Sequence, residues 1–268
     1  MSSKFALITG ANRGLGFECV KTILRQTDPY HVLLCSRSVA AGEKAVASLP
    51  SSLSAPSRVS VIELDVTSPA SITAAVASVK SLAPSLSVLV NNAGILEGEQ
   101  TLSTNFDAVL AVTQAFMPLL ADGSCITTTS SSCGTRFLAS LPPQDASDLS
   151  SSELTVPELS AKITELSNKP DVDIYSLSKC AVNCYTRILA RAHPELHITA
   201  VSPGFTNTGM CANYTGTRQP KEVALGATVF HEALFGLGKG RSGIFLKQNS
   251  SAGTELKDAE TIETAWST

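Results

Sequence analysis

Short runs of apolar and β-branched residues alternate along the chain with longer segments in which apolar residues recur at helical spacing. The runs predict strands at Phe5–Thr9, His31–Ser36, Val59–Leu64, Ser87–Asn91, Ser124–Thr129, His197–Ser202 and Gly243–Lys247. The intervening segments predict helices at Phe17–Gln26, Ala40–Leu49, Ile72–Leu82, Thr104–Leu120, Ile174–Ala192 and Pro220–Phe235. Because the strands are almost continuously apolar, the alternation predicts an α/β fold with a doubly wound, seven-stranded parallel sheet and helices on both faces.

Composition and charge exclude several classes of protein. The chain has 268 residues, of which 43% are hydrophobic and 16% charged, and its net charge is -3. With no cluster of lysine and arginine we expect no binding to nucleic acid, and with no apolar run of about 20 residues we expect no membrane span. The seven cysteines show no Cys-x-x-Cys pair, so reduced thiols in the cytoplasm are expected rather than disulfides or a metal site.

A glycine-rich turn, Thr9-Gly-Ala-Asn-Arg-Gly-Leu-Gly16, joins the first strand to the first helix. Glycines let the backbone turn tightly and approach a pyrophosphate, which the amides at the start of the following helix can bind. The alternative interpretation is a turn without a ligand. We favour dinucleotide binding and expect the cofactor to contact Gly10, Asn12, Arg13, Gly14, Leu15 and Gly16.

The end of the second predicted strand indicates which dinucleotide is bound. Enzymes of this architecture that use NAD usually carry an acidic residue here, whereas an arginine accommodates the 2′-phosphate of NADP. Ser36 takes the place of the acid and Arg37 follows it, with Arg13 available from the glycine turn. We therefore expect NADP(H) as the cofactor; the alternative is that both arginines are solvated surface residues.

Tyr175 and Lys179 are four residues apart in a predicted helix, so their side chains lie on one face. A free tyrosine has a pKa of about 10, and a nearby cation lowers it toward the range of general acid-base catalysis. The pair alone is common in helices, and its meaning depends on the other motifs.

Taken together, these motifs resemble the short-chain dehydrogenase/reductase family, and its carbonyl-reductase-type branch in particular. The resemblance covers residues 4 to 247 and rests on motifs that occur in the family's order: Thr9-Gly-x-x-x-Gly-x-Gly16, Leu64-Asp-Val66, Asn91-Asn-Ala-Gly94, Asn105, Ser131, Tyr175-x-x-x-Lys179 and Pro203-Gly204. It implies a single-domain Rossmann fold over residues 1–268.

The resemblance also implies roles for individual residues. Asn92 is expected to stabilise the sheet, and Lys179 to bind the nicotinamide ribose beside Tyr175. The other expected cofactor contacts are Asp65 and Val66 for the adenine, Asn91, Ala93 and Gly94 along the adenosine side, and Pro203, Gly204 and either Thr206 or Thr208 at the nicotinamide end.

Two further catalytic residues are implied. Ser131 would bind the substrate carbonyl, although Ser130 and Ser132 are neighbouring alternatives. Asn105 would hold a water that supplies protons to Lys179; alternatively, it caps the helix predicted at Thr104–Leu120.

The chain departs from the simplest family pattern on the substrate side. Ser131 and Tyr175 are 44 residues apart, with an insert at about 136–173. Thr155-Val-Pro-Glu158 resembles a capping box, so we expect one short helix in this insert, a partly disordered loop being the alternative. In relatives such an insert covers the helices through which other members dimerise, which implies a monomer. Residues 205–220, and Met210 to Arg218 in particular, resemble a substrate lid, an ordinary surface loop being the alternative.

Together these features predict an NADPH-dependent reductase of aldehydes, ketones or quinones, without a metal, in which Tyr175 is the general acid. Two alternatives remain. One is an NAD(P)-dependent alcohol dehydrogenase, and the other is a pseudoenzyme or sensor that binds NADPH without turnover.

Overall fold

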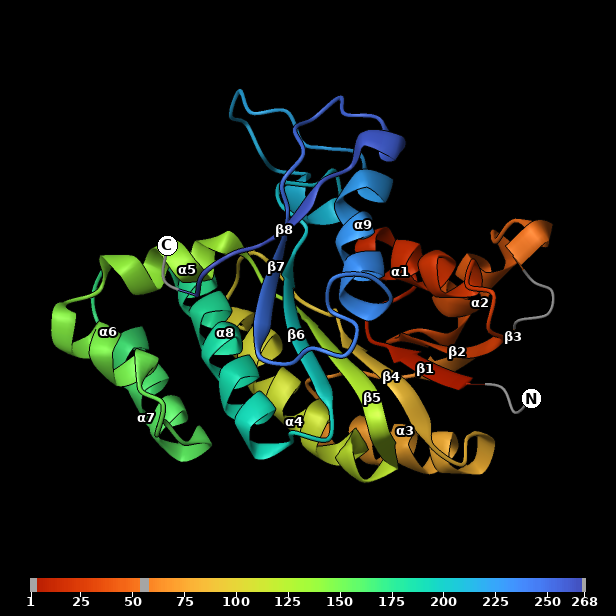
Figure 1. Ribbon diagram of the computed structural model, residues 1–268, viewed down its shortest axis with the longest axis horizontal. Coiled ribbons are helices and arrows are strands. Elements are labelled where there is room, and N and C mark those ends of the chain that lie inside the picture. Colours follow the sequence, from red (N-terminus) through yellow and green to blue (C-terminus); the bar gives the residue numbers. More distant parts are fainter. Residues whose placement is uncertain (1–3, 54–57, 267–268) are drawn as a thin grey trace.

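The computed structural model describes residues 4–53 and 58–266 and contains a Rossmann-like α/β fold (Figure 1). Eight strands form one sheet in the order β3-β2-β1-β4-β5-β6-β7-β8. The strands are β1 (Lys4–Ile8), β2 (Tyr30–Ser36), β3 (Arg58–Glu63), β4 (Leu86–Asn91), β5 (Leu120–Thr129), β6 (His197–Ser202), β7 (Ile244–Gln248) and β8 (Thr261–Glu263). The seven strands predicted from the sequence are all present and pair in parallel.

The prediction of seven strands was one too few, because β8 adds an antiparallel edge to β7. The added strand has three residues and is only partly buried, so it lacks the apolar run by which the others were recognised. The chain after it returns across β7: the Trp266 indole donates a hydrogen bond to the Gly243 carbonyl (3.2 Å) and stacks on Phe245.

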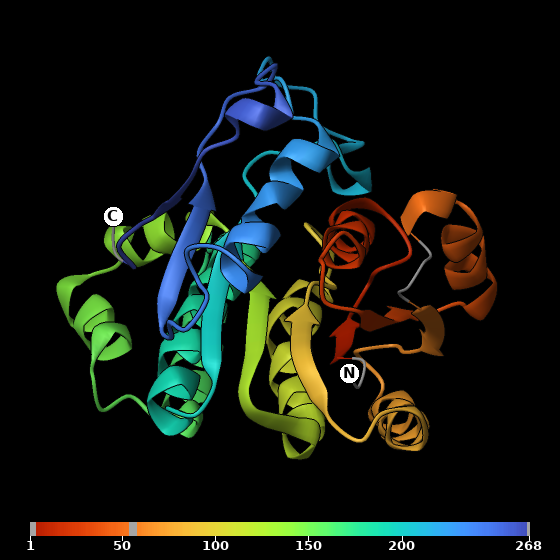
Figure 2. The same ribbon diagram turned by 45° about the vertical axis from the view of Figure 1, so that its right-hand side comes forward.

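Helices cover both faces of the sheet (Figure 2). One face is packed by α1 (Gly14–Leu24), α2 (Val39–Ala47) and α9 (Val223–Leu234). The other is packed by α3 (Pro69–Leu82), α4 (Ala108–Phe116) and α8 (Ile174–Ala192), beside the short turn η3 (Met117–Leu119). Short single turns lie at η1 (Ser51–Leu53) and η5 (Leu256–Asp258). Within the described ranges, no helix combines the length and the apolar character that a membrane span requires.

The insert between β5 and α8 is more helical than predicted. It contains α5 (Ser132–Ser140), α6 (Pro143–Ser150) and α7 (Val156–Ser167). The capping box is confirmed: Glu158 donates its backbone N–H to Thr155, whose own N–H is bonded to the Glu158 carboxylate. The sequence did not indicate α6, because Leu149 is the one hydrophobic side chain that this mostly polar helix buries.

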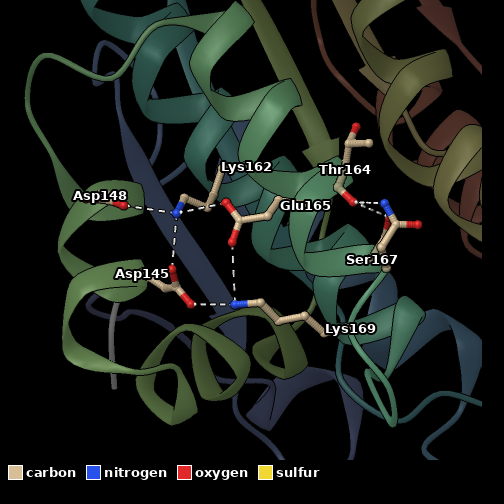
Figure 3. Close-up of polar contacts among 8 residues, drawn as sticks. Asp145, Asp148, Lys162, Thr164, Glu165, Ser167 and Lys169 are labelled. Atoms are coloured by element: carbon tan, nitrogen blue, oxygen red, sulfur yellow. Dashed lines mark hydrogen bonds and ion pairs between the residues drawn. The ribbon is translucent and has the colours of Figure 1, made fainter.

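Ion pairs join α6 to α7 in the insert (Figure 3). Lys162 on α7 lies 3.1 Å from Asp145 and 3.0 Å from Asp148 on α6, and Lys169 also contacts Asp145 (2.9 Å). The insert is fastened to α8 as well, since Arg187 and Arg191 of that helix donate hydrogen bonds to carbonyls of residues 150 and 154 (2.8 and 2.6 Å). The insert therefore forms a packed helical layer over α8, as Figure 1 shows.

Candidate active site

The glycine turn between β1 and α1 has a backbone that favours glycine. Gly10 and Gly14 have φ angles of +61° and +57°, in the left-handed region where a Cβ atom is strained. A Cβ on Gly10 would lie 3.0 Å from the Cα of Ala93, so the turn packs directly on the chain after β4. Leu15, which was expected to contact the cofactor, packs partly against the core under α1. Asn12 and Arg13 remain in the turn, half-buried and exposed respectively.

Asn92 holds this turn in place. Its amide nitrogen donates hydrogen bonds to the carbonyls of Thr9 (2.9 Å) and Gly10 (3.2 Å), and its amide oxygen accepts one from Thr129 at the end of β5 (3.4 Å). The prediction that Asn92 stabilises the sheet is confirmed. The side chain of Asn91 is turned away toward α4, where it donates to the Thr113 hydroxyl (2.8 Å), so at most its backbone can line a cofactor site.

The residues expected near the adenosine lie at the ends of β2 and β3. Ser36 is buried and accepts a hydrogen bond from the Ser38 N–H (3.3 Å), whereas Arg37 is exposed. The Asp65 carboxylate accepts hydrogen bonds from the Thr67 hydroxyl and N–H, which lower its pKa, and the positive charge of Arg37 adds to this effect. Val66 follows, largely buried. Arg13 reaches toward the loop after β6, with its guanidinium 4.0 Å from the place of a Cβ on Gly209.

Tyr175 and Lys179 lie on one face of α8, whose first turn is capped by Asp173. The Lys179 ammonium is 5.7 Å from the centre of the Tyr175 ring and donates a hydrogen bond to the Thr129 carbonyl (2.9 Å). Ser131 caps α5, accepts a hydrogen bond from the Cys133 N–H, and has a hydroxyl near enough to Tyr175 to act on the pKa of its phenol. The structure therefore brings these three predicted residues together at the carboxyl end of β5.

Of the three adjacent serines, Ser131 is the one paired with Tyr175. Ser130 is buried and donates to the Asn183 amide oxygen (2.7 Å), while Ser132 meets Ser202 at the end of β6 (3.3 Å). Gly134 allows α5 to come this close to α8, because a Cβ there would lie 2.5 Å from the Lys179 carbonyl carbon. The approach of the two helices thus sets the spacing of Ser131 and Lys179.

Burial shifts the pKa values of both helix residues. It lowers the pKa of Lys179 to about 8 and raises the pKa of Tyr175 to about 12. The prediction of a lowered tyrosine pKa was therefore wrong for this structure: desolvation of the phenolate outweighs the lowering effect of the Ser131 hydroxyl. The sequence pattern revealed the spacing of the pair but not its burial.

Asn105 lies in η2 (Ser103–Asp107), a single π-helical turn that precedes α4. Its side chain accepts a hydrogen bond from the Ile95 N–H (2.9 Å) and donates to the Ile95 carbonyl (2.8 Å) and the Ser178 hydroxyl (3.1 Å). It is not a helix cap: the helix predicted at Thr104–Leu120 starts with this π-helical turn and continues without a break as α4 and η3. A Cβ on Gly94 would stand 3.0 Å from Asn105 and 3.8 Å from the Lys179 ammonium, so all three residues meet at one point.

The loop after β6, residues 205–220, contains one turn of helix, η4 (Gly209–Cys211), and is called the lid loop after its expected role. Thr206 is buried and bonds the carbonyls of Pro203 and Gly204 within its own turn (3.4 and 3.0 Å). Thr208 instead approaches the glycine turn, 3.6 Å from the place of a Cβ on Gly14. Of the two threonines left open by the sequence, Thr208 is therefore the one beside the predicted pyrophosphate site.

Sequence reasoning missed the polar residues that support these side chains. Asn183, one turn beyond Lys179, is 3% exposed and holds Ser130; Lys221 is 5% exposed and bonds Gln248. The signal for Asn183 was its helical spacing from Lys179. For Lys221 the sequence held no such signal, since its partner Gln248 lies on β7, 27 residues away.

Comparisons with known proteins agree with this geometry. A family model described as short chain dehydrogenase matches residues 4–147. The (+)-neomenthol dehydrogenase of Arabidopsis thaliana is 32% identical over 252 residues, which cover 77% of this chain and 84% of the relative. Carbonyl reductase (NADPH) 3 of Rattus norvegicus is 30% identical over 250 residues, covering 83% and 88%. The solved structure of salutaridine reductase from Papaver somniferum has a TM-score of 0.74 and 25% identity, and covers 90% of this chain and 99% of its own.

Proposed function

The chain belongs to the short-chain dehydrogenase/reductase family of oxidoreductases, and we propose that it is an NADPH-dependent reductase of aldehydes, ketones or quinones. The observation that carries this proposal is the grouping of Tyr175, Ser131 and Lys179 at the carboxyl end of β5, beside a turn built for a pyrophosphate. Ligands of doubly wound sheets bind at this end of the strands.

The glycine turn fits a dinucleotide. Gly10 and Gly14 adopt positive φ angles and add no side chain where the backbone would meet a pyrophosphate, and α1 begins at Gly14 without a side-chain cap on its first amides. We propose that these amides hold the pyrophosphate, that Arg37 binds a 2′-phosphate near Asp65, and that the Pro203–Gly204 turn holds the nicotinamide end. The NADPH in the printed name of the rat relative supports this choice of cofactor. When bound, the reduced nicotinamide supplies a hydride to the carbonyl carbon of the substrate.

The chain's own residues then handle the oxygen and the proton. With a pKa of about 12, Tyr175 stays protonated through the neutral range and donates its proton to the carbonyl oxygen. Ser131 donates a hydrogen bond to the same oxygen as negative charge develops on it. Lys179, charged below its pKa of about 8, stabilises the tyrosine phenolate that proton donation leaves behind.

Asn105 is proposed to support the return of protons through Lys179. Its contacts with Ile95 and Ser178 fix the chain after β4 against α8, and Ser178 in turn donates to the Tyr175 carbonyl (2.7 Å). Asn105 thus keeps the approach to Lys179 beside Gly94 in one geometry.

We further propose that apolar side chains border the site. Leu96 on the loop after β4, and Met210 and Tyr214 on the lid loop, are 39%, 38% and 47% exposed. Phe205 packs edge-on against Tyr214, with ring centres 4.6 Å apart. Leu138 of α5, by contrast, is buried in the core and does not contribute. An apolar or aromatic carbonyl compound suits the remaining side chains.

The insert supports a monomeric protein, since it covers α8 through the Arg187 and Arg191 hydrogen bonds and the buried face of α7. Light scattering at micromolar concentration tests this proposal, which a stable dimer would contradict.

The test of function is NADPH oxidation with a panel of aldehydes, ketones and quinones. Tyr175→Phe removes the proton donor and should lower kcat by at least about a hundredfold. Tyr30→Phe is a matched control, because Tyr30 is a buried tyrosine on β2 away from this site, and its turnover should stay within about twofold of wild type. Turnover that survives Tyr175→Phe would contradict the mechanism.

Cofactor choice has its own test. Arg37→Asp should lower the preference for NADPH over NADH by about tenfold or more, because it exchanges a charged hydrogen bond for repulsion. Arg25→Asp, with the same charge change at the far end of α1, should leave the preference unchanged. Equal shifts in both variants would show that net charge, and not Arg37, is responsible.

A further inference from the structure

Lys221 is a buried lysine that the proposed chemistry does not use. It follows the lid loop, is 5% exposed, and donates a hydrogen bond to the Gln248 carbonyl at the end of β7 (2.9 Å). It also contacts the side-chain oxygen of Gln248, itself only 1% exposed. Burial lowers the pKa of Lys221 to about 8, and the nearby positive charges of Arg218 and Lys247 act in the same direction.

The backbone of Lys221 closes the base of the lid loop. Its N–H donates to the Phe205 carbonyl (2.9 Å) and its carbonyl accepts from the Asn207 N–H (2.8 Å), which forms a short parallel bridge with Thr206. The start of the lid loop is therefore bonded to the residue that directly follows its end.

The side chain of Lys221 lies directly against the Pro203–Gly204 turn. Gly204 has a φ angle of +79°, and a Cβ there would stand 2.8 Å from the Lys221 ammonium. One side chain thus contacts the turn after β6 and the end of β7, while its backbone holds the lid loop.

Folding stability alone does not account for a buried lysine at this position. A buried ammonium is desolvated, and among the ion pairs of the described residues none involves Lys221. An apolar side chain would fill the space without that cost, but it would lack the hydrogen bonds to Gln248 that hold this side chain in place against the turn.

We propose that Lys221, through Gln248, is a positioning residue for the nicotinamide end of the cofactor. The proposal rests on the proposed function, in which the Pro203–Gly204 turn holds that end. Lys221 acts on the geometry of the turn and does not itself touch the reacting atoms.

The test compares two ligands of the full-length protein by fluorescence and calorimetric titration. NADPH contains the nicotinamide, whereas 2′,5′-ADP carries only the adenosine half. Lys221→Met, which keeps the aliphatic stem, should weaken NADPH binding by about tenfold and change 2′,5′-ADP binding by less than twofold. Gln248→Met, which leaves the bond from Lys221 to the Gln248 carbonyl intact, should weaken NADPH binding in the same way but less. The double variant should be no worse than Lys221→Met, because that variant already removes both contacts with Gln248.

Lys247→Met is the matched control. It removes a neighbouring positive charge without removing the hydrogen bonds to Gln248, so NADPH binding should be unchanged. Equal weakening of both ligands by Lys221→Met, additive effects in the double variant, or the same loss in Lys247→Met would each overturn the positioning role. A wild-type protein that binds 2′,5′-ADP but gains nothing from the nicotinamide would instead contradict the proposed function.

Discussion

Two lysines, one in the insert and one in the active site, show opposite uses of the same side chain. Lys162 on α7 lies within 3.2 Å of three carboxylates, those of Asp145, Asp148 and Glu165, and these raise its pKa (Figure 3). Lys179 on α8 is 4% exposed, bonds the Thr129 carbonyl, and has its pKa lowered to about 8 by burial.

The difference lies in what each charge costs. In the insert, the charge of Lys162 is balanced by carboxylates, and its ion pairs join two helices. Surface ion pairs of this kind contribute little to the free energy of folding. In the active site, no ion pair of the described residues includes Lys179. Its charge is therefore free to respond to a phenolate on Tyr175, at a cost in folding stability.

The pH dependence of turnover should separate the two lysines most strongly. Above a pKa of about 8 Lys179 loses its charge, so kcat/KM should fall toward a limit of about tenfold per pH unit, or roughly fiftyfold between pH 8 and 10. Tyr175, with a pKa of about 12, stays protonated over this range. A pH profile with saturating NADPH measures the fall; a flat profile up to pH 10 would contradict the assignment.

Unfolding of the protein caused by deprotonation of Lys179 does not explain such a fall in kcat/KM. Its pKa in the folded protein is below the ordinary value of 10.5, so the unfolded chain binds more protons between pH 8 and 10.5. The contribution of Lys179 to stability therefore increases with pH across this window. Circular dichroism at pH 9 should show the folded protein while turnover has already dropped.

Lys162→Met should have a smaller effect, and on stability instead of activity. Loss of the ion pairs between α6 and α7 should lower Tm by no more than about 3 °C at low salt. High salt should reduce the difference from wild type, because it screens exposed pairs. Lys257→Met, at an exposed position, is the control. A large loss of turnover in Lys162→Met would show that the insert network is part of the active site.

Local patterns predicted most of the framework. The bounds of α8 and β6 match the prediction, and the glycine turn lies where the glycines placed it, because these features depend on neighbouring residues. The π turn at Asn105, the edge strand β8 and the Lys221–Gln248 contact depend on residues distant in sequence, which no periodicity records. The direction of the Tyr175 pKa shift was missed for the same reason, since burial is a property of the packed structure.

The central claim is that Lys179 holds a charge for chemistry and not for folding, and the variant Lys179→Met tests it most directly. Thermal unfolding and NADPH oxidation would be measured at pH 7 beside Lys162→Met. Removing a buried charge should stabilise the protein by about 1–2 kcal/mol while turnover falls at least about a hundredfold. A variant that is less stable than wild type, or that keeps its turnover, would show that Lys179 is a structural residue like Lys162.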